Sequence, residues 1–297
     1  MTPRSRKGLL IGLLIALVFG LGWTFQRQAV KLHNTEESYA LPARFQKDQN
    51  GIMVFCYHRV VKGTVPTQIA QKLSNNSQLH EFNVPASEFA AQMKELHDNH
   101  VKIISSEQMT QMVASHQPIK GKYAVLSFDD IDRSVLDNAV PVMKKYNFPF
   151  TAFVITGNTG QYREGSQMAT WSQIKAAKKL MGDKMTLGLH THNLHHLTAK
   201  MEPVFMQPHY LGKFERDFHL SAKELKAHTG VTANAFAYPY GGGTTQINNF
   251  LAHQQLNWVA TLDSGIVTSQ TNLNETPRLI VNHESWPSII KWLKTSK

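Results

Sequence analysis

A chain of 297 residues can bury one large core, and its 42% hydrophobic and 18% charged residues exclude both a disordered chain and one embedded wholly in a membrane. The formal net charge is +10, but the basic residues are scattered along the chain, which disfavours a nucleic-acid partner. Cys56 is the only cysteine, so an intrachain disulfide is excluded and the fold must rest on its core.

The N-terminal segment has the pattern of a membrane anchor. Three basic residues lie within the first seven positions, and residues 8–25 form an uncharged apolar run long enough to cross a bilayer. We expect residues 1–27 to form a cytoplasmic stub and an uncleaved signal anchor, a single pass of the cell membrane that leaves the rest of the chain extracellular. Cleavage as a signal peptide, which would give a secreted protein, is the alternative. An exported chain of this charge would attract anionic cell-wall polymers or membrane surfaces, unless its basic surface is merely solvated.

Residues 28–50 are polar and lack periodicity, which predicts a linker before a domain over residues 51–297. Within the domain Ser87 is the expected N-cap of the first helix, and residues 62–81 are expected to form a long exposed loop. Strands are predicted at 52–57, 101–104, 123–126, 150–155, 185–189, 234–238, 258–262 and 278–281, and helices at 85–97, 107–114, 135–146, 172–181 and 214–229. This alternation predicts a parallel sheet with right-handed crossovers, either open or closed into a barrel.

Polar motifs follow the carboxyl ends of the predicted strands, where parallel α/β folds place their active sites. The apolar strand 52–57, which contains Cys56 as expected buried filler, is followed by His58. The strand at 123–126 is followed by Ser127-Phe128-Asp129-Asp130. Adjacent carboxylates at a strand end point in different directions, so Asp129 and Asp130 can take two roles, one at a metal ion and one at the water beside it.

A histidine cluster follows the predicted strand at 185–189. His190 and His195 could converge on one ion, with His192 and His196 as alternates. Imidazole and carboxylate groups are standard ligands of zinc and related metals, and three protein ligands leave positions open for water and substrate. The two motifs together predict metal-assisted hydrolysis. The next strand leads into Pro239-Tyr240-Gly241-Gly242-Gly243, a rigid turn suited to aiming backbone NH groups at an anion, with an ordinary tight turn as the alternative.

Three of these segments carry a family resemblance. Ser-Phe-Asp-Asp, His-Thr-x-x-x-His and Phe-x-Tyr-Pro-Tyr-Gly, in this order, resemble the principal motifs of the NodB-homology polysaccharide deacetylases, carbohydrate esterase family 4. The match runs from about Met53 to the C-terminus. The step from His190 to His195 and the segment Cys56-Tyr57-His58-Arg59-Val60 resemble most closely the branch that de-N-acetylates poly-β-1,6-N-acetylglucosamine, a biofilm exopolysaccharide. The resemblance implies a distorted (β/α) barrel, preceded here by the N-terminal transmembrane helix.

The resemblance also implies a metal site and a base. Asp130, His190 and His195 would bind a divalent metal, zinc in the first place, with cobalt, nickel, iron or manganese as alternatives. Asp129 would act as the general base, and the backbone NH of Tyr240 would help to bind the oxyanion.

Other roles are implied at the rim of the site. His283 would protonate the leaving nitrogen as general acid, with His58 as the alternative. The polysaccharide substrate would contact Pro239, Tyr240, His58 and Trp171, the last by stacking on a sugar ring.

Two positions depart from the family pattern. Ile131 stands where a glycine normally follows the aspartate pair, and Asn234 replaces the arginine that orients the base. Arg133 or Arg278 would then have to tune the pKa of Asp129.

The function predicted from the sequence is metal-dependent removal of N-acetyl groups from an extracellular polymer of N-acetylglucosamine. Peptidoglycan or a chitooligosaccharide is the alternative substrate. Of other classes, a catalytically weak carbohydrate-binding cell-wall protein on the same fold is the main alternative, since a fold does not guarantee activity. A glycoside hydrolase is disfavoured because its two carboxylates must stand several ångströms apart, which neighbouring residues seldom allow.

Overall fold

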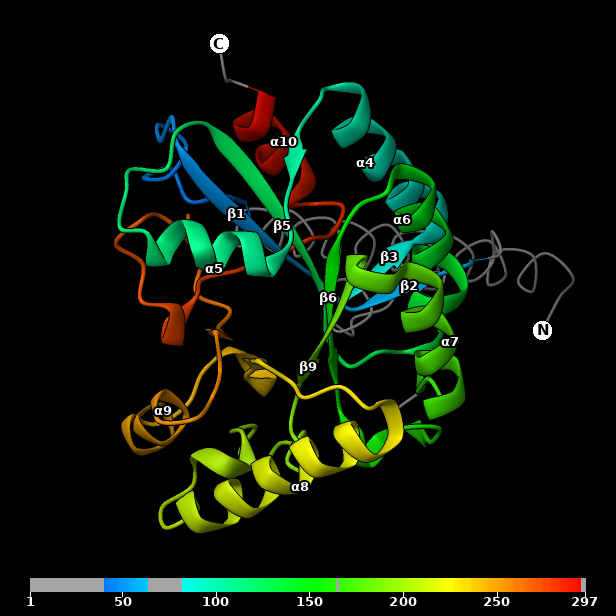
Figure 1. Ribbon diagram of the computed structural model, residues 1–297, viewed down its shortest axis with the longest axis vertical. Coiled ribbons are helices and arrows are strands. Elements are labelled where there is room, and N and C mark those ends of the chain that lie inside the picture. Colours follow the sequence, from blue (N-terminus) through cyan, green and yellow to red (C-terminus); the bar gives the residue numbers. More distant parts are fainter. Residues whose placement is uncertain (1–39, 64–81, 164–165, 295–297) are drawn as a thin grey trace, which may run out of the picture.

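The computed structural model describes residues 40–63, 82–163 and 166–294 (Figure 1). Its centre is an eight-stranded parallel sheet with the order β11-β10-β9-β6-β5-β1-β12, in which the short β4 also pairs with β5. The strands are β1 (Gly51–Tyr57), β4 (Lys102–Ile103), β5 (Lys122–Phe128), β6 (Phe150–Val154), β9 (Met185–Leu189), β10 (Ala235–Ala237), β11 (Trp258–Ala260) and β12 (Leu279–Ile280). The smaller pairs are β2 (Arg59–Val61) with β3 (Asn83–Pro85), and β7 (Tyr162–Arg163) with β8 (Ser166–Gln167).

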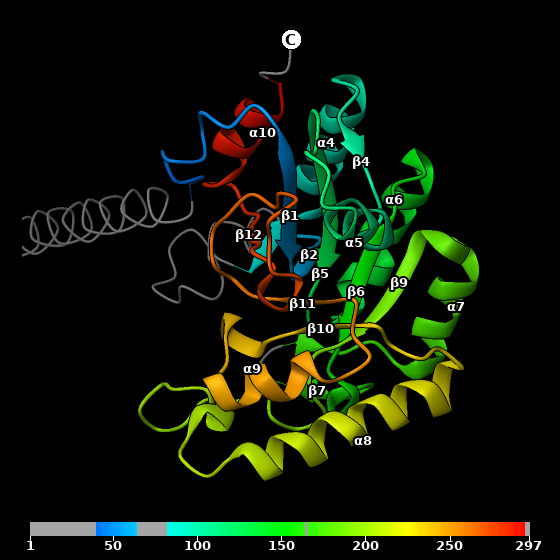
Figure 2. The same cartoon turned by 60° about the vertical axis from the view of Figure 1, so that its left-hand side comes forward.

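The sheet curls into an incompletely closed barrel (Figure 2). Neighbours in the sheet follow the chain order from β1 through β5, β6, β9 and β10 to β11, and β12 returns to pair with β1. The remaining gap between β11 and β12 is spanned by an isolated bridge from Ala260 to Thr276. The predicted parallel sheet is therefore confirmed, in the form of a curled partial barrel.

The helices lie mainly outside the sheet. They are α4 (Ala86–Asp98), α5 (Ser106–Ala114), α6 (Val140–Tyr146), α7 (Trp171–Met181), α8 (Leu211–Thr229), α9 (Thr245–Ala252) and α10 (Trp286–Lys294). In both views α4, α6 and α7 stand along one side of the sheet, and α8 runs beneath its β9 end. Their apolar sides, such as Ile174, Ala177 and Met181 of α7, pack on the outward-facing strand residues in the main core. Burial of this face stabilises each helix more than its own propensity does.

Alternation along the strands decides what faces the inside of the barrel. In β1, Met53, Phe55 and Tyr57 belong to the outer core, whereas Ile52 and Val54 belong to a second core that includes Met109 and Val113 of α5. Successive strand side chains point to opposite faces. Cys56 on β1, and Ser127 and Asp129 at the end of β5, therefore point to the same inner face. They lie in the barrel interior beyond the second apolar core.

Several expectations are corrected by the structure. The N-cap of α4 is Pro85, which makes no side-chain cap hydrogen bond, and not Ser87. The predicted helix 135–146 begins as a π-helical turn over Val135–Ala139 before α6. The β2–β3 and β7–β8 pairs, α9 and α10 were not predicted, because short strands and helices carry few periods of any pattern.

The N-terminal predictions fall largely outside the described residues. This holds for the signal anchor at 1–27, for most of the linker and for most of the loop at 62–81. Among the described residues no helix is both long and apolar enough to cross a membrane. Within the predicted linker, Leu41 is buried and its NH donates to Ser288 Oγ at 2.8 Å, so contacts with the domain begin before residue 51.

Candidate active site

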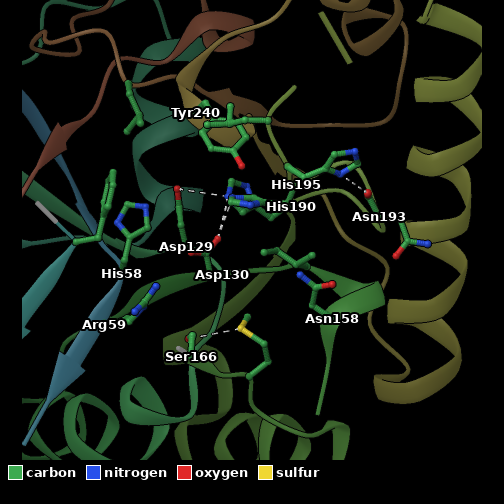
Figure 3. Close-up of a pocket in the computed structure, with 16 residues that line it drawn as sticks. His58, Arg59, Asp129, Asp130, Asn158, Ser166, His190, Asn193, His195 and Tyr240 are labelled. Atoms are coloured by element: carbon green, nitrogen blue, oxygen red, sulfur yellow. Dashed lines mark hydrogen bonds and ion pairs between the residues drawn. The ribbon is translucent and has the colours of Figure 1, made fainter. Parts of the chain in front are cut away.

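A single pocket of about 350 Å³ collects most of the predicted residues. It lies where β1, β5, β9 and β10 end, and Figure 3 shows the side chains that face it. The members of the predicted site that line it are His58, Asp129, Asp130, His190, His195 and Tyr240. Parallel strands bring their carboxyl ends to one edge of the sheet, which explains how residues up to 182 positions apart meet here.

Asp130, His190 and His195 form a compact cluster. Asp130 Oδ1 lies 3.4 Å from His190 Nε2 and 3.2 Å from His195 Nε2. One ligand atom from each of the three side chains lies within 4.8 Å of the others, close enough to share one ion. His190 is almost fully buried, while Asp130 and His195 are about one-fifth exposed, so the cluster opens toward the pocket.

The donor set fits a divalent metal. Asp130 Oδ1 is a buried oxygen with no hydrogen-bond partner of good geometry among the described residues, although two imidazoles face it. His190 Nδ1–H donates to the Ala237 carbonyl at 2.8 Å, so the neutral tautomer directs the lone pair of Nε2 toward Asp130. A backbone carbonyl that fixes the tautomer in this way is the usual outer partner of a metal-binding histidine. An unsatisfied carboxylate oxygen and an unprotonated imidazole nitrogen are what a cation such as zinc requires.

Asp217 of α8 holds the histidine loop. Its two carboxylate oxygens accept hydrogen bonds from the backbone NH groups of His192 and Asn193, each at 2.7 Å. The loop turns at Thr191, whose φ of 67° lies in the left-handed region. Two backbone NH groups that donate to one carboxylate restrict this turn, and the loop then brings His195 back toward His190.

His192 and His196, the alternative ligands considered from the sequence, contact other groups. His192 Nδ1 lies 2.9 Å from Thr156 Oγ1, and His196 Nδ1 lies 3.1 Å from the Asn193 carbonyl. His196 lines the pocket but does not belong to the three-residue cluster.

Asp129 is held by a buried arginine. Arg278 Nη1 donates to Asp129 Oδ1 at 2.7 Å and Arg278 Nη2 donates to Oδ2 at 2.8 Å, a bidentate pair. The same guanidinium donates to Ser127 Oγ and to the Thr261 carbonyl. Arg278 thus supplies the contact expected of the family arginine that Asn234 replaces. Arg133, the other arginine considered, pairs instead with Asp137 on the exposed surface.

Both aspartates of the site have lowered pKa values, each because of different neighbours. Burial by itself would raise the pKa of Asp129, but the Arg278 guanidinium outweighs burial, and the pKa is lowered to about 2. Burial opposes ionisation of Asp130 as well, and the facing His195 and His190 imidazoles hold its pKa well below the usual range. Both carboxylates are therefore ionised at neutral pH.

His58 and Cys56 border Asp129 on the β1 side. One atom from each of the three side chains lies within 4.8 Å of the others, and Cys56 Sγ donates to Asp129 Oδ2 at 3.4 Å. Burial lowers the pKa of His58 to about 4, so its imidazole is neutral at pH 7. Burial raises the pKa of the Cys56 thiol, which is fully buried as predicted and has little nucleophilic character.

Positive φ angles recur around the site, and Tyr240 and Ile131 are two of the residues that adopt them. Tyr240 has a φ of 60° within the short helical turn Pro239–Gly241, and its ring packs 4.9 Å from the His195 ring. Ile131 has a φ of 56°, an unfavourable region for a β-branched residue, yet its side chain is buried in the main core. The chain therefore keeps the turn that a glycine normally makes and strains Ile131 to do so.

The structure does not bring every predicted residue to the pocket. His283 is 78% exposed and lies 3.5 Å from Glu88, whereas the alternative, His58, lines the cavity. Trp171 stacks on His228 at the start of α7, with ring centroids 4.6 Å apart. Pro239 is buried and precedes Tyr240 without lining the pocket itself.

Sequence reasoning missed Asp217, and a usable signal was present. Asp217 lies one residue before Phe218 on the buried face of α8, which also includes Phe214, Ser221 and Leu225. An acidic residue on the apolar face of an amphipathic helix requires a buried partner. The pattern itself does not say which one.

Comparisons with known proteins show what this chain is similar to. A sequence model described as polysaccharide deacetylase matches residues 116–259. The solved structure of IcaB from Ammonifex degensii is 31% identical, with a TM-score of 0.73 over 83% of this chain and 98% of that one. A poly-β-1,6-N-acetyl-D-glucosamine N-deacetylase of Staphylococcus aureus strain MSSA476 is 25% identical over 84% of this chain and 85% of that protein. Streptococcus pyogenes deacetylase PplD in complex with acetate shares the fold, with 20% identity, a TM-score of 0.67 and coverage of 83% and 99%.

Proposed function

This chain belongs to the polysaccharide deacetylase family, and from that premise we propose that it removes N-acetyl groups from poly-β-1,6-N-acetylglucosamine. The chain is a polysaccharide N-deacetylase, an amide hydrolase. The choice of polymer is supported by its relatives, because the Staphylococcus protein is named for this substrate. The observation that carries the proposal is the meeting, in one pocket, of a three-ligand cluster with a separate carboxylate held by Arg278.

The proposed cofactor is a divalent metal, with zinc as the first choice. Asp130, His190 and His195 would hold it. A divalent ion there would polarise the acetamide carbonyl and acidify a water molecule. Three protein ligands are typical of catalytic rather than structural zinc sites.

Asp129 is the proposed general base. Its low pKa keeps it ionised but makes it a weak base, so it can accept a proton only from an acidified water. Arg278 restricts the carboxylate to one orientation, which pre-positions it for proton transfer. Attack of the water oxygen on the acetamide carbon would then follow, and the backbone NH of Tyr240, a residue that lines the pocket, is the proposed donor to the developing oxyanion.

His58 is the proposed proton carrier to the leaving nitrogen. It lines the pocket and has a ring nitrogen within 4.8 Å of the Asp129 carboxylate. Because its imidazole is neutral at pH 7, it must gain a proton during the reaction, and the proton that Asp129 removes from water is the nearest source. Transfer of that proton to nitrogen breaks the C–N bond and releases acetate and a sugar amine.

The test is acetate release by the full-length protein, purified in detergent. The substrates are pentamers of N-acetylglucosamine with β-1,6 or β-1,4 linkage. Each is assayed with protein from which a chelator has removed the metal, and again after zinc, cobalt, nickel, iron or manganese has been added back to the protein. We expect metal-dependent acetate from the β-1,6 pentamer. Acetate from the β-1,4 pentamer alone would redirect the proposal to peptidoglycan or chitooligosaccharides. Release from neither, with metal shown to be bound, would overturn it.

The cellular setting is also proposed. The apolar segment at 8–25 supports a chain anchored in the cell membrane with its domain extracellular, where the net charge of +10 would draw it to anionic wall polymers. Fractionation of cells followed by protease treatment from outside tests this, because a cytoplasmic domain would resist the protease.

A further inference from the structure

Arg59 presents a positive charge to the pocket. It follows His58, begins β2 and lines the cavity, where its side chain is only partly exposed. Figure 3 shows it entering the same space as His58 and Asp130. Within the described ranges of the chain, no carboxylate forms an ion pair with it, whereas Arg133 and Arg278 each have one. A guanidinium that lines a pocket without a carboxylate partner is free to bind a ligand there, and its five N–H groups are all donors.

The backbone that carries Arg59 is fixed on both sides. Its NH donates to the Phe82 carbonyl at 3.0 Å, and β2 pairs with β3. The next residue, Val60, accepts from Asn138 Nδ2 at 2.7 Å and donates to Ser134 Oγ at 3.1 Å. The guanidinium therefore extends from a well-anchored strand and belongs to the built wall of the pocket.

The other charges of the pocket leave Arg59 uncompensated. The negative charge of Asp129 is neutralised by Arg278. Asp130 faces His190 and His195 and is the proposed metal ligand. With a divalent cation added, the pocket has a positive balance to which Arg59 contributes one full charge. Such a pocket accepts neutral sugars and repels cations.

We propose that Arg59 is a specificity-determining residue that disfavours polymer segments in which the unit beside the reacting one is already deacetylated. The inference rests on the proposed function, because it concerns which units of that polymer are chosen. An N-acetylated unit is neutral, and its carbonyl and hydroxyl oxygens can accept hydrogen bonds from a guanidinium. A deacetylated unit carries an ammonium group, which the guanidinium repels. Deacetylation would then proceed at spaced rather than adjacent units.

The size of the effect follows from Coulomb repulsion. Two unit charges about 7 Å apart, at an effective dielectric constant of about 40, repel one another enough to change an equilibrium about five- to ten-fold. We therefore expect kcat/KM for the fully acetylated pentamer to exceed that for a pentamer with one central glucosamine, and the part of this ratio due to Arg59 to be about five- to ten-fold.

The experiment compares these two β-1,6 pentamers with the full-length, metal-loaded protein. Arg59→Gln removes the charge, Arg59→Lys retains it, and Arg133→Gln removes a similar charge outside the pocket as a matched control. We expect Arg59→Gln to lower the selectivity ratio about five- to ten-fold, and Arg59→Lys and Arg133→Gln to leave it within about two-fold of the wild-type ratio. Urea unfolding of each variant verifies that it folds.

The pH gives an independent readout. A sugar amine titrates near pH 8, as α-amino groups do at about 7.7–8.0, whereas Arg59 stays charged. The other titratable groups that line the pocket are His58, Asp129, Asp130, His190, His195, His196 and Tyr240, and all of them are retained in Arg59→Gln, so the wild-type protein and this variant are compared at each pH. The difference in selectivity ratio between the wild-type protein and Arg59→Gln should therefore be largest near pH 7 and shrink by about pH 9.5, where the amine is neutral.

The outcomes separate this inference from the function on which it rests. Turnover of the acetylated pentamer with an unchanged ratio in Arg59→Gln would overturn the role of Arg59 alone. A difference between the wild-type and Arg59→Gln ratios that is undiminished at pH 9.5 would do the same, because the amine is then neutral. Absence of acetate release by the wild-type protein from either pentamer would overturn both proposals.

Discussion

The buried pair between Arg278 and Asp129 makes a quantitative prediction. Replacing Arg278 with Met fills similar space but leaves the Asp129 carboxylate buried without its bidentate partner. Breaking a buried ion pair from one side typically costs about 3–5 kcal/mol of unfolding free energy. We expect a loss of about this size at pH 7 in urea unfolding of the metal-free full-length protein.

The pH dependence of this loss has a defined sign. In the wild-type protein the pKa of Asp129 is lowered to about 2, so its contribution to stability is complete above about pH 4 and is lost as the pH falls through about 2. In the Arg278→Met variant, burial acts unopposed and raises the pKa of Asp129 above its usual value. The stability deficit of the variant should therefore shrink as the pH is lowered from 7 to 4.5 and the carboxyl becomes protonated.

Two controls test the reasoning. Arg133→Met breaks an exposed pair with Asp137 and should cost less than about 1 kcal/mol. Adding Asp129→Asn to Arg278→Met removes the unpaired charge, so the double variant should be more stable than the sum of the single losses by about 1–3 kcal/mol. A loss below about 1 kcal/mol for Arg278→Met, or a deficit independent of pH, would refute an electrostatic role for this arginine.

Three further predictions concern the metal site and the turn beside it. Asp129→Asn should retain metal in elemental measurements but lower kcat by about 10²–10⁴-fold, because it removes the proposed base and no metal ligand. His190→Ala should lose most of its metal. Loss of metal from both variants would show that the roles of base and ligand are assigned wrongly. Asp217→Asn should weaken metal binding about 10-fold in competition with a chelator, because the histidine loop loses part of its anchor; an unchanged affinity would contradict that role. Ile131→Gly should be more stable than Ile131→Ala by about 1 kcal/mol in urea unfolding. Both variants lose the buried side chain, but only glycine relieves the positive φ. The reverse order of stability would argue against strain at this turn.

The sequence by itself determined the elements that carry the site. The apolar runs of β1, β5 and β9 are unambiguous because both faces of each strand are buried, and each is followed at once by its functional residue. The residue pattern predicted an aspartate pair and a histidine cluster at one site, and the family resemblance singled out Asp130, His190 and His195. The structure brings these three together. Local pattern suffices where a residue's role depends on its place at the end of a strand.

Tertiary structure alone decided the contacts between distant segments. The partner of Asp129 could not be predicted from local pattern. Arg133 is four residues away in the sequence and Arg278 is 149 positions away, yet Arg278 forms the pair because β12 lies beside β1. The same holds for His58 against His283 and for Asp217, whose partners lie on another element. Curling of the sheet sets these distances, and curvature is a property of the packed barrel rather than of any one strand.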